Sequence, residues 1–263
     1  NFGTMTKPLH AGNACRNGII ASSLAKGGFT ADFGILEGVG GFFDMFTSGE
    51  VAESRPESDD FNKNWCIIST GISFKPYPCC RATHSSIDAA LELRKAYKIN
   101  GDEISAIICK HNSQLHRLLR YHQPITGLEA KFCVEYCVSA TILRGKLLLE
   151  DFKDDKVNQA EVQDLIKKTK CSHFDSESMN RSAIQPTEVL IKLKNGTEYS
   201  QSTTIARGDP RNPLTDKELL TKFKDCLSHS ACIKYTDQII DTLSNIESID
   251  SISIKNLMRI LSS

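Results

Sequence analysis

The stretch EVLIKLKNGTEYSQSTTI, residues 188–205, predicts two β-strands joined by a tight turn. Apolar and polar side chains alternate on both sides of Asn195-Gly196, and this dipeptide favours the backbone of a two-residue hairpin. Such alternation is typical of strands that bury one face and expose the other. The chain therefore contains a sheet as well as helices.

Other elements of a mixed α+β domain precede this hairpin. The run ISAIICKH predicts a strand at about residues 104–111, and a helix is expected at about 81–97. The run WCIISTGISFKPY, residues 65–77, is rich in β-forming residues and is also expected to be extended. Together these segments predict a small α+β unit in the middle of the chain.

Two capping boxes mark further helix starts. In TGLE, Thr126 can accept from the Glu129 amide while Glu129 reaches back, which predicts a helix through about residue 143 and makes Glu129 a cap rather than an acid catalyst. TDKE, residues 215–218, opens a second such helix near the C-terminus. Both signals are local, because they depend on residues only three positions apart.

The order of these segments predicts how the chain is divided. A helix is expected at residues 8–26, and the polar stretch 47–60 is the best boundary candidate. We expect a helical domain to begin in residues 1–60, an α+β domain to occupy 61–212, and helices of the first domain to return in 213–263. The fold class is then α+β, with a partial helical domain interrupted by a smaller α+β domain.

Composition excludes several classes of function. Lys plus Arg and Asp plus Glu number 32 each, so the zero net charge predicts neither a nucleic-acid nor a membrane partner. The sequence has no apolar run of 18 residues and no signal-peptide pattern, which indicates a soluble, cytoplasmic chain. Its ten cysteines include no CxxC spacing, and we interpret them mainly as buried free thiols.

A cationic helix start is found in GTMTKPLHAG, residues 3–12. A residue before proline avoids helical geometry, so Lys7 is expected at the N-cap, with Pro8 and His10 in the first turn. An ammonium is unfavourable beside the positive end of a helix unless an anion binds there. Lys7 and His10 are therefore candidates for binding a carboxylate; the alternatives are a solvated lysine and a core histidine.

KPYPCCRATHSSIDAAL, residues 75–91, repeats this arrangement. Arg81 and His84 lie three residues apart and should share one face of a helical first turn. A guanidinium suits a carboxylate, and an imidazole can transfer a proton near neutral pH. A surface arginine and a capping histidine remain alternatives, and Cys79 and Cys80 are either thiolates at a helix start or packing residues.

HNSQLHRLLRYHQP, residues 111–124, holds three histidines and Tyr121. No carboxylate or cysteine accompanies His111, His116 and His122 at a helical metal-binding spacing, so we predict no metal site. The phenol of Tyr121 could donate a proton or bind a substrate carboxylate. The sequence also lacks a phosphate-binding loop and a dinucleotide fingerprint, and no cofactor is expected.

Four stretches closely resemble the MmgE/PrpD family: GTMTKPLHAGNACRNGIIASSLAKGGFTADFGILEG, KPYPCCRATHSSIDAALELR, TGLEAKFCVEYCVSA and RGDPRNPLTDKELLTKF. The family includes dehydratases of 2-methylcitrate, decarboxylases of cis-aconitate and epimerases of iminodisuccinate. The resemblance implies a large helical domain, an α+β lid domain, a cofactor-independent active site in the cleft between them, and a homodimer.

The same resemblance implies roles for individual residues. Lys7 and His10 look like the contribution of the helical domain to a polycarboxylate site, and Arg81, His84 and Tyr121 look like that of the lid. Catalysis is expected from Lys7, His10, His84 and Tyr121, and substrate binding from Arg81 and Cys80.

Two departures from the family pattern affect the expected function. Decarboxylases of the family carry an additional histidine near the position of Cys80, so we expect dehydration of 2-methylcitrate to 2-methylaconitate, with decarboxylation and epimerisation as alternatives. Family members also have a long helical portion before GTMTKPLHAG. We therefore expect a homodimer, or association with that missing half. The alternative, from a different class of function, is an inactive truncated paralogue that acts only as a binding partner.

Overall fold

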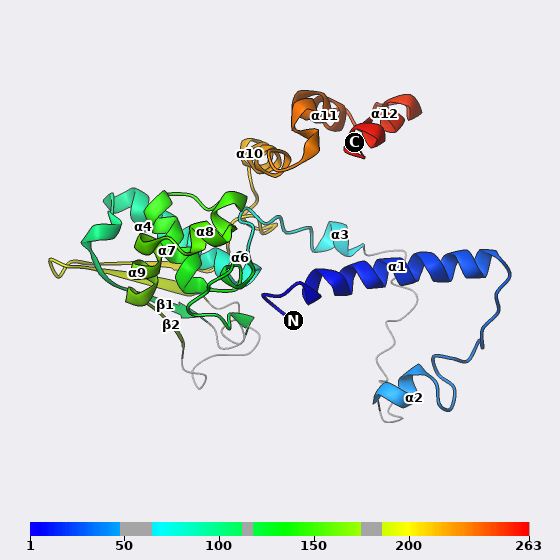
Figure 1. Ribbon diagram of the computed structural model, residues 1–263, viewed down its shortest axis with the longest axis horizontal. Helices are drawn as coiled ribbons and strands as arrows, with labels where there is room; N and C mark the ends of the chain where they lie inside the picture. Colours follow the sequence, from blue (N-terminus) through cyan, green and yellow to red (C-terminus); the bar gives the residue numbers. More distant parts are fainter. Residues whose placement is uncertain (48–64, 112–117, 175–185, 263) are drawn as a thin grey trace. The chain divides into compact units, whose positions relative to one another are not determined.

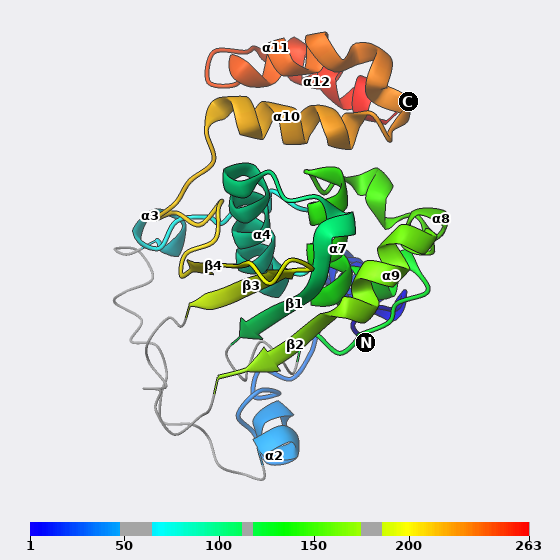
Figure 2. The same ribbon diagram turned by 90° about the vertical axis from the view of Figure 1, so that its left-hand side faces the viewer.

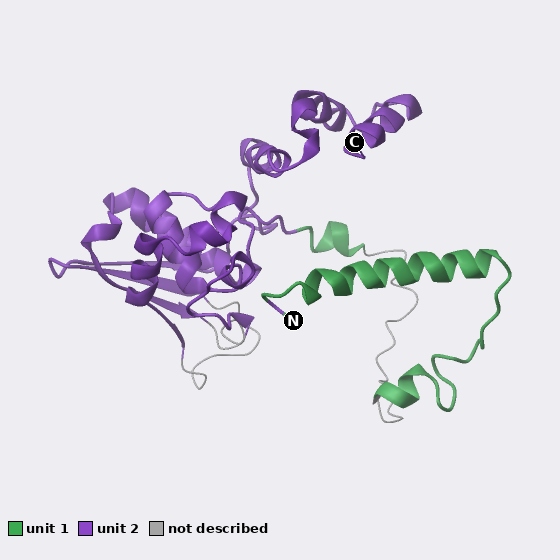
Figure 3. Cartoon of the chain, in the orientation of Figure 1, with its two compact units in different colours: residues 1, 3–72 green, residues 2, 73–263 purple. Residues whose placement is uncertain are grey.

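The computed structural model describes residues 1–47, 65–111, 118–174 and 186–262. The chain divides into two compact units: residues 1 and 3–72 form unit 1, and residues 2 and 73–263 form unit 2 (Figures 1 and 3). The two units are described separately below.

The predicted hairpin is confirmed as strands β3 (Thr187–Leu193) and β4 (Glu198–Thr203) of unit 2. They pair antiparallel, and Gly196 in the connecting turn has a φ of 87°, a left-handed backbone that favours glycine. The predicted strand at 104–111 is also confirmed, as β1 (Ile104–His111). The local alternation of the sequence thus identifies three of the strands correctly.

The sheet of unit 2 has the order β2-β1-β3-β4 (Figure 2). β1 pairs parallel with β2 (Thr169–His173) and antiparallel with β3. Helices α4 (His84–Tyr97), α7 (Val134–Arg144) and α9 (Ala160–Lys168) contact the sheet and lie on one of its faces. The parallel pairing is possible because the helices between β1 and β2 carry the chain back.

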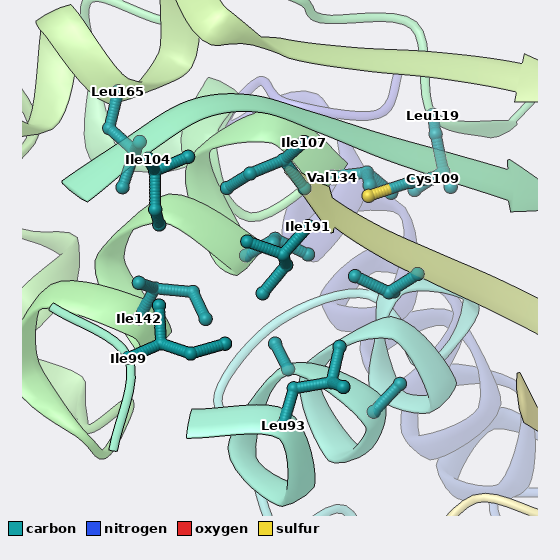
Figure 4. Close-up of a cluster of buried hydrophobic side chains, with 14 of the residues drawn as sticks. Leu93, Ile99, Ile104, Ile107, Cys109, Leu119, Val134, Ile142, Leu165 and Ile191 are labelled. Carbon is teal, nitrogen blue, oxygen red and sulfur yellow. The ribbon is translucent and has the colours of Figure 1, made fainter. Parts of the chain in front are cut away.

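The core of unit 2 lies between this sheet and its helices. Figure 4 shows side chains from α4, α7 and the strands packed together, and Leu93, Ile107, Ile142 and Ile191 are almost fully buried. Burial of each such side chain stabilises the folded state by roughly 1.5–3 kcal/mol relative to leaving it exposed to water. This packing makes unit 2 a rigid support for residues at the start of α4.

The helix predicted to begin at Thr126 begins there but is interrupted. Thr126 and Glu129 form the predicted capping box, yet α6 ends at Ala130 (Gly127–Ala130) and α7 starts at Val134. The prediction of one continuous helix is wrong because the Lys131 carbonyl accepts the Cys80 N–H at 2.8 Å instead of an intrahelical donor. This bond ties the segment before α4 to the break between α6 and α7.

The run at 65–77 does not form the predicted strand. Its start is a single helical turn, α3 (Cys66–Ser69), and no strand occurs among the described residues 65–77. Ile67 and Ile68 are exposed, and β propensity alone does not hold a segment extended where no neighbouring strand pairs with it.

Unit 1 is formed by α1 (Thr6–Lys26), α2 (Phe42–Thr47) and α3. α1 begins two residues earlier than predicted, with Met5 as N-cap and Lys7 as its second residue. Pro8 is tolerated because it lies in the first turn, where its missing N–H has no intrahelical partner to lose. Lys7 is helical despite the steric bias against helical backbone before a proline. No residue of α1 is buried.

The C-terminal part of unit 2 is helical, as predicted. Thr215 and Glu218 form the second capping box at the start of α10 (Asp216–Leu227), which is followed by α11 (Thr236–Ser244) and α12 (Ser251–Leu261). The remaining short elements are α8 (Asp154–Val157) and single 3₁₀ turns at Arg81–Thr83, Gly101–Glu103, Leu149–Phe152 and Ala231–Tyr235. Within the described ranges, no helix is both long and apolar enough to cross a membrane.

Candidate functional site

The predicted proximity of Arg81 and His84 is confirmed at the start of α4. The 3₁₀ turn Arg81–Thr83 leads directly into the helix, and Arg81 Nη1 lies 3.3 Å from His84 Nδ1. A guanidinium only donates, so Nδ1 must be the acceptor. The proton of the neutral His84 imidazole is therefore assigned to Nε2.

Arg81 is also bonded to the loop that precedes α10. Nη1 donates to the Arg207 carbonyl at 2.9 Å, Nη2 donates to the Ala206 carbonyl at 3.4 Å, and Nη2 lies 3.9 Å from Asp209 Oδ2. These bonds use three of the five N–H donors of a guanidinium when His84 is counted. The Arg81 side chain is also 31% exposed, so its guanidinium can bind a further acceptor.

His84 lies inside unit 2 and not on its surface. Its exposed fraction is zero, and its ring packs edge-on against that of Tyr77 with centroids 5.1 Å apart. Nε2 has no hydrogen-bond partner among the described residues. In this conformation His84 can reach a solute only if neighbouring groups move or if the solute enters the interior.

Cys79 is a candidate that the sequence analysis left between two interpretations. The thiol is buried and lies 3.0 Å from Thr83 Oγ1. Burial by itself raises the pKa of this thiol, but its contacts with Cys137 and His84 together hold the pKa below its ordinary value. Burial raises the pKa of the Cys109 and Cys133 thiols, so Cys79 stands apart from these packing cysteines.

Cys80 and Lys75 flank Cys79 on the same segment. Cys80 is half-buried, and its backbone N–H is the donor to Lys131 described above. The Lys75 ammonium donates to the Cys79 carbonyl at 3.3 Å. Lys75 adds a second cation near Arg81 that the sequence analysis did not single out, although the lysine before Pro76 repeats the Lys7-Pro8 pattern.

Tyr121 is half-buried in unit 2, and its hydroxyl donates to the Phe2 carbonyl at 3.0 Å. The neighbouring His122 is exposed, and its Nδ1 lies 2.7 Å from Oε1 of the buried Glu135. His116 lies outside the described residues. In the described part of the chain, no three His, Cys, Asp or Glu side chains gather as a metal site would require.

Asp88 was missed by the sequence analysis. It lies in the second turn of α4 and is only 4% exposed, with Oδ1 accepting from the Tyr77 hydroxyl at 2.6 Å and Oδ2 from the Arg207 N–H at 2.8 Å. The one available signal was its position in SSIDAAL, where small and apolar residues surround the acid. Beside this carboxylate, burial raises the pKa of Tyr77, which keeps the phenol protonated as a donor.

The RGDPRNP stretch, residues 207–213, forms a charged turn that lies against the start of α4. Asp209 pairs with Arg211 at 2.8 Å, and a hydrogen bond from that guanidinium lowers the pKa of Asp209 to about 2. Arg207 pairs with Glu218 in the capping box of α10 and lowers the pKa of Glu218 to about 2. Asp209 in the turn and Glu218 at the start of α10 are therefore two carboxylates that stay ionised in mild acid.

These shifts predict how stability depends on pH. Both carboxylates have folded-state pKa values below the ordinary 3.8 and 4.5, so their stabilisation is complete above those values and is lost as the pH falls towards 2. We expect the Asp209→Asn/Glu218→Gln double variant to show a flatter dependence of unfolding free energy on pH between about 4.5 and 2 than the parent. Urea unfolding at a series of pH values measures this.

The control for this prediction is the Glu161→Gln/Asp164→Asn double variant on the exposed face of α9. It replaces one aspartate and one glutamate, as the test variant does, and leaves Asp209 and Glu218 unchanged. Equal pH slopes for the two double variants would contradict the assignment.

The candidate residues fall into two sets. Lys7 is exposed in the first turn of α1 in unit 1, and that turn contains no acidic residue. His10 is also exposed, but as the fifth residue of α1 it lies beyond the first turn predicted for it, because the helix begins two residues earlier. Cys80, Arg81, His84 and Tyr121 belong to unit 2. Of these, the structure brings Arg81 and His84 into direct contact, with Cys80 next to them in the chain.

Comparison with known proteins identifies the class to which this fold belongs. Residues 77–253 match the MmgE/PrpD C-terminal domain, and the chain belongs to the MmgE/PrpD family. This confirms the resemblance found in the sequence.

Individual relatives are named cis-aconitate decarboxylase. The chain is 28% identical to the Mus musculus protein over 260 residues, which are 97% of this chain and 52% of that protein. It is 25% identical to the Homo sapiens protein over 97% of this chain and 53% of that protein. It is 27% identical to the Aspergillus terreus (strain NIH 2624 / FGSC A1156) protein over 85% of this chain and 48% of that protein. The chain spans about half the length of these curated relatives.

Proposed function

We propose that the chain supplies the C-terminal half of a cofactor-independent lyase that acts on a small tricarboxylate. The observation that carries this proposal is similarity to cis-aconitate decarboxylases along nearly the whole chain. The structure supports it with two cationic helix starts, Lys7 on α1 and Arg81 before α4. A helix start favours an anionic ligand over a cation, and a guanidinium suits a carboxylate, so each of these two positions is suited to binding an anion.

The first candidate reaction is decarboxylation of cis-aconitate, the reaction for which the relatives are named. One carbon–carbon bond breaks, carbon dioxide leaves, and the remaining carbanion takes a proton to give a dicarboxylate. Cations at Lys7 and Arg81 would hold the carboxylates that remain, and Tyr121, His10 or His84 would supply the proton.

The second candidate is dehydration of 2-methylcitrate to 2-methylaconitate. It is favoured by the sequence resemblance, because this chain lacks the additional histidine near Cys80 that the resemblance implies for the decarboxylases. A base removes a proton next to a carboxylate, and an acid helps hydroxide leave as water. The same cations would bind the three carboxylates. The two reactions thus share a binding site and differ in which bond breaks.

Product analysis by NMR tests the proposal. Each tricarboxylate is incubated with the chain alone and with the chain fused to the N-terminal half of the mouse relative. We expect turnover in the fusion, with loss of carbon dioxide indicating the first candidate and loss of water the second. A folded fusion that acts on neither compound would contradict the proposal and favour a chain that only binds a partner.

A further inference from the structure

Asp88 joins two segments, one at Tyr77 and one at Arg207, to the same turn of α4. Its carboxylate is 4% exposed, and its two oxygens accept from Tyr77 and from the backbone of Arg207. An unpaired buried carboxylate is strongly unfavourable, so both hydrogen bonds are needed to keep Asp88 inside. The 77 segment and the 206–209 loop are therefore held by one side chain.

Both of these segments contact the candidate site. The 206–209 loop offers its Ala206 and Arg207 carbonyls to the guanidinium of Arg81, and the Tyr77 ring packs on His84. Arg81 in turn donates to His84 Nδ1. Asp88 thus holds the partners of Arg81 and His84, and its own hydrogen bonds in the described part of the chain go to Tyr77 and the Arg207 backbone.

The backbone of the 206–209 loop is shaped to make this contact. Gly208 has a φ of 81°, and its carbonyl accepts the Phe74 N–H at 2.8 Å. The Gly208 N–H donates to the Asn212 carbonyl at 2.8 Å. This geometry presents the two carbonyls before Gly208 towards Arg81.

We propose that Asp88 is a positioning residue of the candidate site. Through the 206–209 loop and Tyr77 it holds the Arg81 guanidinium in place to bind a substrate carboxylate, and it fixes His84 as the Nε2–H tautomer. The link to a carboxylate substrate rests on the proposed function; the positioning of the two side chains does not.

The test compares Asp88→Asn with Asp151→Asn. Asp151 is also buried, and it likewise accepts one side-chain donor, Arg144 at 2.9 Å, and one backbone N–H, Leu148 at 2.6 Å. Asp151→Asn therefore removes another buried carboxylate of unit 2 that accepts one side-chain and one backbone hydrogen bond, although its side-chain partner is a guanidinium and not a phenol. Each variant is measured at a temperature that is the same number of degrees below its own melting temperature.

Two readouts use the chain alone. Hydrogen exchange should show the Arg207 amide exchanging at least about tenfold faster in Asp88→Asn but unchanged in Asp151→Asn. A second readout is the ¹⁵N spectrum of the chain labelled with ¹⁵N-histidine, in which the His84 signals are identified by their loss in His84→Gln. The chemical shifts of the two ring nitrogens should no longer be those of the Nε2–H tautomer in Asp88→Asn, and should be unchanged in Asp151→Asn. A third readout uses the fusion described above, where cis-aconitate should bind about tenfold more weakly to Asp88→Asn than to the parent.

Unchanged Arg207 exchange and His84 signals in Asp88→Asn would overturn the proposal, as would equal changes in Asp151→Asn. If Asp88→Asn does not fold, Tyr77→Phe replaces it. That variant keeps the ring on His84, removes one of the two bonds to Asp88, and should shift the same signals in the same direction by less. A parent fusion that binds no tricarboxylate would contradict the proposed function, while exchange and imidazole signals would still decide the positioning.

Discussion

Gly208→Ala should destabilise unit 2 by about 3–5 kcal/mol, because the new methyl group meets both strain and a backbone clash. Gly208 has a φ of 81°, and a Cβ there would lie 2.0 Å from the Phe74 carbonyl oxygen. That oxygen is part of the backbone and cannot rotate away as a side chain could. Urea unfolding followed by circular dichroism measures the loss.

Gly196→Ala is the matched control for this prediction. Gly196 has a similar φ of 87°, but no atom lies within 4 Å of a Cβ built there. We expect a loss of only about 1–2 kcal/mol, which is the strain of a left-handed residue by itself. Asparagine tolerates this backbone, so Gly196→Asn should be milder still, whereas Gly208→Asn should remain severe. Equal losses of unfolding free energy at the two glycines would show that the clash with Phe74 does not contribute to the destabilisation.

Lys7→Ala should lower kcat/KM of the fusion by about 10²–10³-fold, the size expected when one group that stabilises developing charge is removed. The same change should shift the unfolding free energy by no more than about 1 kcal/mol, which is the scale of one charge at a helix end. Loss of activity without loss of stability distinguishes a binding role from a structural one. Steady-state kinetics and thermal melting of the same preparations give both quantities.

Lys26→Ala, at the other end of α1, should behave in the opposite way. Lys26 is in the last turn, where a cation is favourable, so its removal should destabilise the helix by about 0.3–1 kcal/mol and leave turnover intact. Lys7→Ala with full activity would remove Lys7 from the candidate site.

The parts of the fold that sequence reasoning identified depend on neighbouring residues. The β3–β4 hairpin follows from alternation around Asn195-Gly196, and two helix starts follow from capping boxes only three residues apart. The contact between Arg81 and His84 follows from the same short spacing.

The parts that were missed depend on partners far along the chain. The break between α6 and α7 uses the Cys80 N–H, and the roles of Asp88 and Arg81 require a loop more than a hundred residues away. Nothing in SSIDAAL reveals that the backbone of Arg207 will bond to its acid. No strand forms among residues 65–77 for the converse reason, since local propensity had no partner strand to stabilise it.

The arrangement of the sheet has a consequence for how the chain folds. β1 is an inner strand, and Ile107 pairs with Thr169 on one side and with Ile191 on the other. During synthesis β1 leaves the ribosome long before either neighbour exists, while the β3–β4 hairpin can close at once. Formation of the sheet must then bring β1 back across a long loop, which slows folding and leaves an apolar strand with open edges in the meantime. Newly made chains should therefore depend on chaperones until β3 has been synthesised.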